Sequence, residues 1–194
     1  MGGTNIMKNM ATSRYSVALI LLSAALLGGC AGMGDFGCDM HETQARGTKP
    51  VTTYSLAAPK AGENSLRPLP AGSAPQVPVY KITFKPGFTK PCNTVSLRKD
   101  VLIQRSDESN IVLSEIREFY AEDGTLITTS TQDISEQVRK SGAYVATTPL
   151  PIPKSAPPGK YKIVNKLLFE RRGDRRAQTP IARAEGFFYI IPQQ

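Results

Sequence analysis

The sequence predicts a mainly β protein whose folded part is a single antiparallel β-sandwich. Short alternations of apolar and polar residues recur from residue 79 onward, and turn-forming residues separate them. Seven or so short strands are expected within residues 79–194, and a segment of this length suits one domain. Strands of this number and spacing favour two packed sheets.

The first strands follow from period-two patterns. In residues 79–84 (VYKITF), Tyr80, Ile82 and Phe84 alternate with other residues, as in a half-buried strand. Residues 94–105 (TVSLRKDVLIQR) predict one or two further strands. Residues 110–131 predict two strands joined around Asp123-Gly124, a strong hairpin signal.

The second half predicts a helix and three more strands. Residues 131–142 (TQDISEQVRKSG) are the helix candidate, with Asp133 as N-cap. Residues 143–153 (AYVATTPLPIP) predict an edge strand, because proline cannot donate a ladder hydrogen bond. Residues 160–170 (KYKIVNKLLFE) predict a strand. Residues 180–191 (PIARAEGFFYII) are apolar on both faces, which predicts a strand inside the fold rather than at its edge.

Residues 149–191 also resemble the closing strands of bacterial immunoglobulin-like and fibronectin-III-like domains. The shared features are a Pro-Gly turn, here Pro158-Gly159, a strand that carries Tyr161, and a final strand. The resemblance implies an immunoglobulin-like sandwich for residues 79–194. A transthyretin-like sandwich fits nearly as well, so both kinds stay open.

The first thirty residues carry an export signal. Residues 17–27 (VALILLSAALL) are uncharged and follow Lys8 and Arg14. This run is too short to span a membrane and is typical of a signal peptide. It ends in the sequence LGGC at Cys30, which resembles the lipobox of bacterial lipoproteins. An ordinary secretory signal or a buried core helix is the alternative.

The lipobox resemblance implies that residues 1–29 are removed and that Cys30 is lipidated, so that the protein contacts a membrane through its N-terminal lipid. Ala31 and Gly32, rather than Asp, follow the cysteine. By the same resemblance this favours the outer membrane, with the protein on its periplasmic face or on the cell surface. A Gram-positive surface lipoprotein is the alternative.

Residues 30–78 are expected to form a flexible tether, because residues 47–78 are rich in Pro, Gly, Ala and Ser. With Cys30 lipidated, Cys38 and Cys92 are left as an even pair. An oxidising compartment favours a disulfide between them. Two free thiols, or bonds to a partner, are the alternatives.

The chain is moderately basic, with a formal net charge of +8. This favours anionic partners such as a glycolipid or peptidoglycan, although basic residues also coat ordinary soluble surfaces. Four arginines lie at a predicted hairpin tip, where their planar forks suit phosphate or carboxylate: Arg171, Arg172, Arg175 and Arg176. A solvated loop is the alternative. Nucleic acid is not expected, because no aromatic platform accompanies the arginines.

No motif reaches the specificity of an enzyme signature, and no cofactor is expected. His41 is the only histidine, and it lies in the predicted tether, where a catalytic triad would have to use it. Cys38, Met40 and His41 are soft or borderline metal ligands, but a solvated histidine beside a structural cysteine is favoured, so no metal site is predicted. Glu115 and Glu118 would point to opposite faces of a regular strand.

The sequence therefore predicts a non-catalytic, lipid-anchored envelope protein. Its sandwich is expected to serve protein–protein interaction or assembly of an envelope complex. The candidate surfaces are the proline-rich residues 149–153 and the arginine tip. The alternative is a periplasmic lipoprotein that binds or senses a ligand or metal.

Overall fold

The computed structural model describes residues 38–40, 42–43, 50–58, 66–173 and 178–193. The chain divides into two compact units, residues 1–40 and 41–194. Residues 38–40, the described part of the first unit, are helical. The strands described below belong to the second unit.

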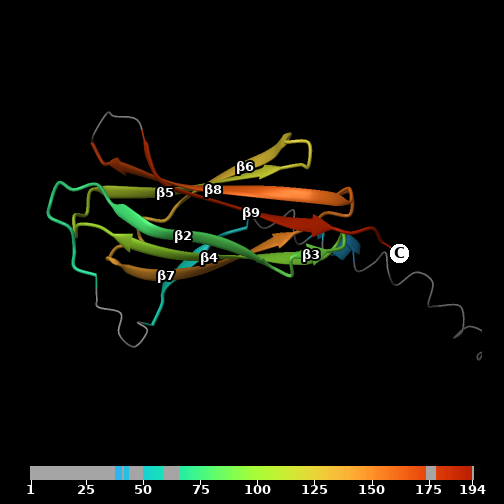
Figure 1. Cartoon of the computed structure of the whole chain (residues 1–194), viewed down its shortest axis with the longest axis horizontal. Helices are drawn as coiled ribbons and strands as arrows, with labels where there is room; N and C mark the ends of the chain where they lie inside the picture. Colours follow the sequence, from blue (N-terminus) through green and yellow to red (C-terminus); the bar gives the residue numbers. More distant parts are fainter. Residues whose placement is uncertain (1–37, 41, 44–49, 59–65, 174–177, 194) are drawn as a thin grey trace, which may run out of the picture. The chain divides into compact units, whose positions relative to one another are not determined.

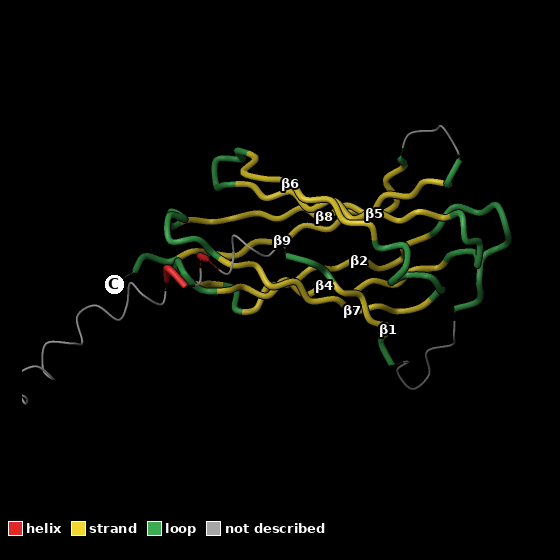
Figure 2. Tube along the Cα trace, turned by 180° about the vertical axis from the view of Figure 1, so that it is seen from behind, coloured by secondary structure: helices red, strands yellow, loops and turns green. Residues whose placement is uncertain are grey.

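Two β-sheets form the second unit. The four-stranded sheet has the order β1 (Thr53–Leu56), β7 (Gly142–Pro151), β4 (Thr94–Gln104), β2 (Gln76–Lys85). The five-stranded sheet has the order β3 (Phe88–Thr89), β9 (Thr179–Ile190), β8 (Gly159–Arg171), β5 (Ile111–Tyr120), β6 (Leu126–Asp133). All neighbours are antiparallel except β3 and β9. The sheets lie face to face (Figures 1 and 2), which confirms the predicted β-sandwich.

The strand order is that of an immunoglobulin-like sandwich. Strands β2, β4 and β7 correspond to A, B and E of that fold, and β5, β8 and β9 to C, F and G. Strand β6 extends the second sheet beside β5, as C′ does in variable-type domains. Strand β1 occupies the place of D, beside β7, although it precedes all the other strands in the chain. Within the described residues, no helix is long and apolar enough to cross a membrane.

The core consists of two hydrophobic clusters with a polar layer between them. On β4, Leu97 belongs to one cluster and Val101 to the other, and the buried Lys99 lies between them. The same succession occurs on β8, where Asn165 separates Ile163 from Leu167. Because inward positions alternate along a strand, these polar residues occupy core positions.

Strand β1 corrects the predicted domain boundary. Residues 53–56, expected in the tether, pair antiparallel with residues 144–147 of β7, and β2 already begins at Gln76. Tyr54 is buried in the first hydrophobic cluster. The side-chain amide of Gln132 bonds both the N–H and the carbonyl of Thr52. One buried aromatic ring and these hydrogen bonds hold a segment whose composition resembles a linker.

The hairpin predicted around Asp123-Gly124 is confirmed, since β5 and β6 pair antiparallel across it. Gly124 has a φ of 85°, which suits glycine, and the Asp123 carboxylate accepts a hydrogen bond from the Thr125 N–H at 2.8 Å. The tight turn and its local hydrogen bond explain why this element was predictable from two residues.

The helix predicted over residues 131–142 is wrong. Strand β6 continues through Asp133, and one turn follows, closed by a hydrogen bond from Val138 N to Ile134 O at 3.0 Å. The Asp133 carboxylate does accept from Ser135 N, so the capping signal acts locally. Ile134 and Val138 are both buried in the core, and β7 begins at Gly142, which leaves no room for a second turn.

Two predictions about sheet edges are half right. Strand β7 pairs with β1 over residues 144–147, so only its proline-containing end, from residue 148 onward, lacks a second described neighbour. Strand β9 lies between β8 and the short β3, as expected of an inner strand. However, Phe187 and Tyr189 on its second face are 43% and 49% exposed, so that face is not buried.

Candidate functional site: a buried polar layer and an exposed aromatic face

The polar layer combines charged and neutral groups from both sheets. Lys99 of β4 and Glu115 of β5 have relative exposures of 0% and 1%. Around them lie five more side chains, all buried except the partly buried Tyr80: Thr52, Tyr80, Arg117, Thr148 and Asn165. Charged residues are almost never fully buried unless they are paired, so the burial of Lys99 and Glu115 depends on the groups that contact them.

Glu115 is the centre of the layer. Its Oε1 accepts hydrogen bonds from Lys99 Nζ and, at 3.2 Å, from Asn165 Nδ2. Its Oε2 accepts a hydrogen bond from the Tyr54 hydroxyl. The second buried cation, Arg117, places Nη2 at 3.6 Å from the same Oε1. The Glu115 carboxylate therefore contacts two cations, one side-chain amide and one phenol.

Thr52 completes the contacts of both cations. Its hydroxyl oxygen accepts hydrogen bonds from Lys99 Nζ at 2.8 Å and from Arg117 Nη2 at 3.0 Å. It also lies 2.7 Å from the hydroxyl oxygen of Thr148. The residue just before β1 is thus bonded to β4, β5 and β7, which ties the N-terminal strand to both sheets.

Burial controls the ionisation of the layer. It lowers the pKa of the Lys99 amine to about 8, an effect that Arg117 increases and Glu115 opposes. Burial, followed by Tyr80 and Glu115, raises the pKa of the Tyr54 phenol well above its ordinary value. The pKa of Tyr80 is also raised, first by burial and then by Glu115. The phenols stay protonated, whereas the amine loses its proton more readily than a surface lysine.

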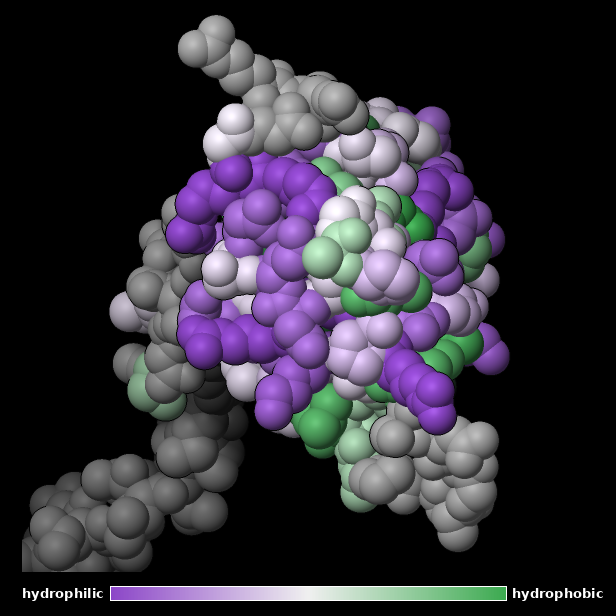
Figure 3. Space-filling view, turned by 90° about the vertical axis from the view of Figure 1, so that its left-hand side faces the viewer, coloured by the Kyte–Doolittle hydropathy of each residue, from purple (hydrophilic) through white to green (hydrophobic). Residues whose placement is uncertain are grey.

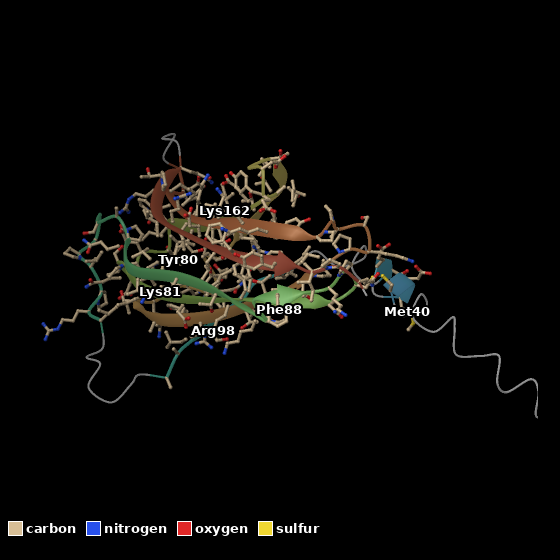
Figure 4. All side chains as sticks on the ribbon, turned by 45° about the vertical axis from the view of Figure 1, so that its right-hand side comes forward. Met40, Tyr80, Lys81, Phe88, Arg98 and Lys162 are labelled. Carbon is tan, nitrogen blue, oxygen red and sulfur yellow. The ribbon has the colours of Figure 1, made fainter. Side chains whose placement is uncertain are left out.

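Three polar atoms of the layer lack a hydrogen-bond partner among the described residues: Tyr80 Oη, Arg117 Nε and Asn165 Oδ1. Tyr80 points from β2 toward the opposite sheet (Figure 4), close enough to Asn165 and Tyr54 for both side chains to influence its pKa. Unpaired buried polar atoms are uncommon in folded proteins and call for an explanation. Chemically, the layer holds a buried amine and a carboxamide that share one carboxylate.

The sequence contained the signal for this layer, although no candidate site was predicted there. Lys99 stands in phase with Val95, Leu97, Val101 and Ile103, all of which are buried. The prediction that Glu115 and Glu118 point to opposite faces is confirmed, since Glu115 is buried and Glu118 pairs with Lys166 outside. A charged residue in the apolar phase of a strand is therefore the sign that could have revealed the layer.

An exposed aromatic face lies on the outer side of the five-stranded sheet, at β3, β9 and β8. Phe88, Phe187 and Tyr189 are 61%, 43% and 49% exposed. Phe88 is paired in register with Tyr189, which in turn is paired with Lys160. Phe88 and Lys162 are both marked in Figure 4. Exposed aromatic residues that gather in this way are typical of interaction surfaces.

The lysines of this aromatic face contact rings rather than acids. Lys160 Nζ lies 4.2 Å from the centroid of the Phe187 ring, and Lys162 Nζ lies 4.9 Å from that of Tyr120. Neither lysine forms an ion pair with any residue that the structure describes. The aromatic face therefore presents two uncompensated positive charges among aromatic rings.

The other end of the same outer surface differs from the aromatic face. A shallow groove there is lined by Lys166, Leu168, Pro180, Ile181, Ala182 and Arg183. Its two cations are already paired, Lys166 with Glu118 at 2.6 Å and Arg183 with Glu185 at 2.8 Å. On this outer surface, the lysines without an ion pair among the described residues are thus those of the aromatic face, Lys160 and Lys162.

The predicted arginine tip is only partly within the described structure. Arg171 donates hydrogen bonds to Glu108 Oε2 and to the carbonyl of Ser73, both at 3.0 Å, so its guanidinium is engaged inside the domain. Arg172 is exposed at the turn, and the end of the sandwich where β8 finishes is mainly hydrophilic (Figure 3). Arg175 and Arg176 lie outside the described residues. Contact between these arginines and an anionic partner stays a prediction.

The cysteines bear on two further predictions. Cys38 and Cys92 are both disulfide-bonded, in agreement with the predicted Cys38–Cys92 pair. A disulfide sulfur is not a thiolate, which weakens the alternative of a metal site at Cys38, Met40 and His41. Among the described residues, no group of His, Cys, Asp and Glu could hold a metal ion. Cys30 and His41 lie outside them.

Comparisons with known proteins identify no family for this chain. No protein-family model and no curated protein matches the chain. Solved structures with some likeness include a family 123 glycoside hydrolase from Clostridium perfringens (11% identity, TM-score 0.32). The calcium-binding mutant of β-glucuronidase 2 from Bacteroides uniformis has 20% identity and a TM-score of 0.34, and the sporulation control protein Spo0M from Bacillus subtilis has 11% and 0.26.

The matches cover 55%, 59% and 63% of this chain and 22%, 12% and 50% of those chains, respectively. The chain thus spans half or less of the length of these proteins. At TM-scores of this size the likeness carries no argument about function.

Proposed function

We propose that this protein is a lipid-anchored envelope protein that presents a non-catalytic β-sandwich to a protein partner. The observation that carries the proposal is the aromatic face, where Phe88, Phe187 and Tyr189 stand exposed beside Lys160 and Lys162. Large aromatic side chains supply much of the binding energy at protein interfaces. In a domain with a filled core, such residues have no structural need to face outward.

The proposed partner is a protein surface that carries acidic side chains next to an apolar patch. Lys160 and Lys162 form no ion pairs within the described structure, so an incoming carboxylate would gain a partner without displacing another. The formal charge acts in the same direction, because removal of residues 1–29 takes only Lys8 and Arg14 from the +8 of the whole chain and leaves the rest positive. An anionic glycolipid or peptidoglycan would also bring negative charge to the two lysines, but it offers less apolar surface to the aromatic rings.

The anchor is proposed from the LGGC sequence at Cys30. Lipid at Cys30 would hold the domain at the outer membrane, facing the periplasm or the cell exterior, where a partner in an envelope complex is concentrated near the aromatic face. Several acyl chains on one cysteine would give stable anchoring, which a single chain does not.

Site-specific photocrosslinking in the native membrane tests this function. A photoreactive residue replaces Phe187 in one variant and Leu126 in a matched control, since Leu126 is an exposed apolar residue of the same sheet but lies on β6. We expect one envelope protein to be captured repeatedly from position 187 and not from position 126. A Cys30→Ala version should lose this product together with membrane attachment.

Two outcomes would overturn the proposal. Capture of lipid or peptidoglycan alone from position 187 would replace the protein partner by an envelope polymer or glycolipid. Equal capture from positions 187 and 126 would show that the aromatic face has no special role.

A further inference from the structure

The polar layer contains more positive than negative charge. Lys99 and Arg117 are two buried cations, and Glu115 is the one buried carboxylate among the described residues. An uncompensated charge in a protein interior is costly unless chemistry or a ligand removes it. Within the described part of the chain, the layer also leaves Tyr80 Oη and Asn165 Oδ1 without hydrogen-bond partners. Both observations suggest that the groups seen here are precursors rather than the final state.

We propose that Lys99 and Asn165 join in an intramolecular isopeptide bond, between Lys99 Nζ and Asn165 Cγ, with Glu115 as the catalytic residue. The juxtaposition that supports this is a single atom, Glu115 Oε1, which accepts hydrogen bonds from both Lys99 Nζ and Asn165 Nδ2. The amine and the carboxamide therefore meet at the group able to move protons between them.

The reaction balances without a cofactor or an oxidant. The Glu115 carboxylate takes a proton from the Lys99 ammonium, and the neutral amine attacks Asn165 Cγ. In the tetrahedral intermediate, Glu115 returns this proton to Nδ2 and accepts one of the two protons left on the attacking nitrogen, which keeps the other as the N–H of the new amide. The bond from Cγ to Nδ2 breaks as the new amide forms. Ammonia leaves and takes up that last proton, so the products are a secondary amide, an ammonium ion and ionised Glu115.

The surroundings favour each step. Burial and Arg117 ease loss of the proton from Lys99. The unpaired hydroxyl of Tyr80 lies beside Asn165, where it can donate to Oδ1 as negative charge develops on that oxygen. After reaction, one cation is gone, and Glu115 and Arg117 remain as a balanced pair 3.6 Å apart. The new bond would join β4 in one sheet to β8 in the other.

Mass spectrometry of the full chain tests the proposal. Trypsin cleaves after Arg98, Arg105, Lys162 and Lys166 but not after a Lys99 whose Nζ is part of an amide. The bond would therefore yield one branched product from residues 99–105 (KDVLIQR) and 163–166 (IVNK). We expect this product in the wild-type protein at the combined mass of the two peptides less one ammonia. Deamidation or succinimide formation within one peptide cannot produce the branch, so the product is specific to the bond.

Variants separate the roles of the three residues. Lys99→Met and Asn165→Ala should give no branched product. Glu115→Gln keeps both reacting groups but cannot carry protons, so the product should disappear there as well. Glu118→Gln is the matched control, because Glu118 lies on the same strand but points outward to Lys166, and it should leave the product intact. Asn165→Asp should form the same bond by loss of water.

The wild-type chain decides the question even if a variant fails to fold. Peptides 100–105 (DVLIQR) and 163–166 without the branch, from correctly folded wild-type protein, would overturn the proposal, because cleavage after Lys99 requires a free amine. Branching that persists in Glu115→Gln would overturn the role of Glu115. The inference is independent of the proposed partner, because it concerns the interior of the sandwich and needs no binding measurement.

Discussion

At the scale of single residues, Thr52 is the most connected neutral group of the polar layer, since its hydroxyl oxygen bonds Lys99, Arg117 and Thr148. Thr52→Val keeps the shape but removes this oxygen, which leaves buried donors unsatisfied. We expect it to lower the free energy of unfolding by about 1–3 kcal/mol. Urea denaturation measures the loss. The exposed neighbour Thr53 supplies the control, because Thr53→Val should change stability by less than about 0.5 kcal/mol.

Glu108 predicts a response to acid. The N–H of Gly72, the hydroxyl of Ser106 and the guanidinium of Arg171 lower its pKa from 4.5 to about 2. The stabilisation is therefore complete above pH 4.5 and is lost as the pH falls from 4.5 toward about 2. Glu108→Gln should be less stable than the wild type at neutral pH, and the difference should shrink across this range. Thermal melts at several pH values report it, and a constant difference would contradict this assignment.

The alternation of apolar and polar residues predicts which strand positions face the core. It does not predict that some of these inward positions hold polar residues. Alternation places Tyr80, Ile82 and Phe84 on one face of a strand, and in the structure Ile82 is buried and the other two are partly buried. Alternation also places Lys99 and Asn165 on the inward face, although polar side chains such as these are usually found at the surface. Only the tertiary structure brings Glu115 from another strand to pair with Lys99, and no local pattern contains that encounter.

At the scale of elements, β2 and β9 approach each other closely at Gly186. A Cβ built there would lie 2.8 Å from Phe84 Cε2 and 3.3 Å from Ile82 Cγ1. Gly186→Ala should therefore destabilise the domain by roughly 1–3 kcal/mol through overpacking. Gly87→Ala is the matched control, since nothing described lies within 4 Å of its built Cβ. Equal melting temperatures for the two variants would show that the strands can separate without cost.

Strand β1 is the element most easily mistaken for linker. Tyr54→Ala removes its buried ring and the hydrogen bond to Glu115, and should cost about 3–5 kcal/mol. Loss of β1 would also bare the edge of β7, which invites pairing between molecules. We therefore expect a larger apparent mass in size-exclusion chromatography for Tyr54→Ala. Ser55→Ala, at an exposed position of the same strand, should stay unchanged in both measurements.

Elements with a local cause were predictable, and elements with a distant cause were not. The hairpin at Gly124 is determined by its own turn residues. The segment after Asp133 has a cap but becomes one turn, because Ile134 and Val138 are held in the core. Strand β1 depends on Gln132 and Gln137, which bond Thr52 and Tyr54 from far along the chain. Composition alone therefore assigned β1 to the tether.

At the scale of the whole molecule, the positive charge of the chain acts on any acidic partner together with Lys160 and Lys162, which form no ion pair with the residues that the structure describes. Lys160 and Lys162 lie two residues apart on β8. Lys81 is an exposed residue of β2, in the other sheet, and Lys140 is an exposed residue just before β7 of that sheet. Changing either pair to glutamate alters the net charge equally, so the two double variants separate local from overall electrostatics.

With the partner captured by photocrosslinking at position 187, we expect Lys160→Glu/Lys162→Glu to slow association by about tenfold or more at low salt. Lys81→Glu/Lys140→Glu should have a much smaller effect, because Lys81 is paired in register with Asp100 of β4 and Lys140 precedes β7, both outside the sheet that carries the aromatic face. Stopped-flow or surface-based kinetics at several salt concentrations measures both rates. The difference should fade near 1 M salt, where screening acts over about 3 Å. Equal slowing by both pairs would mean that net charge, and not the aromatic face, guides the encounter.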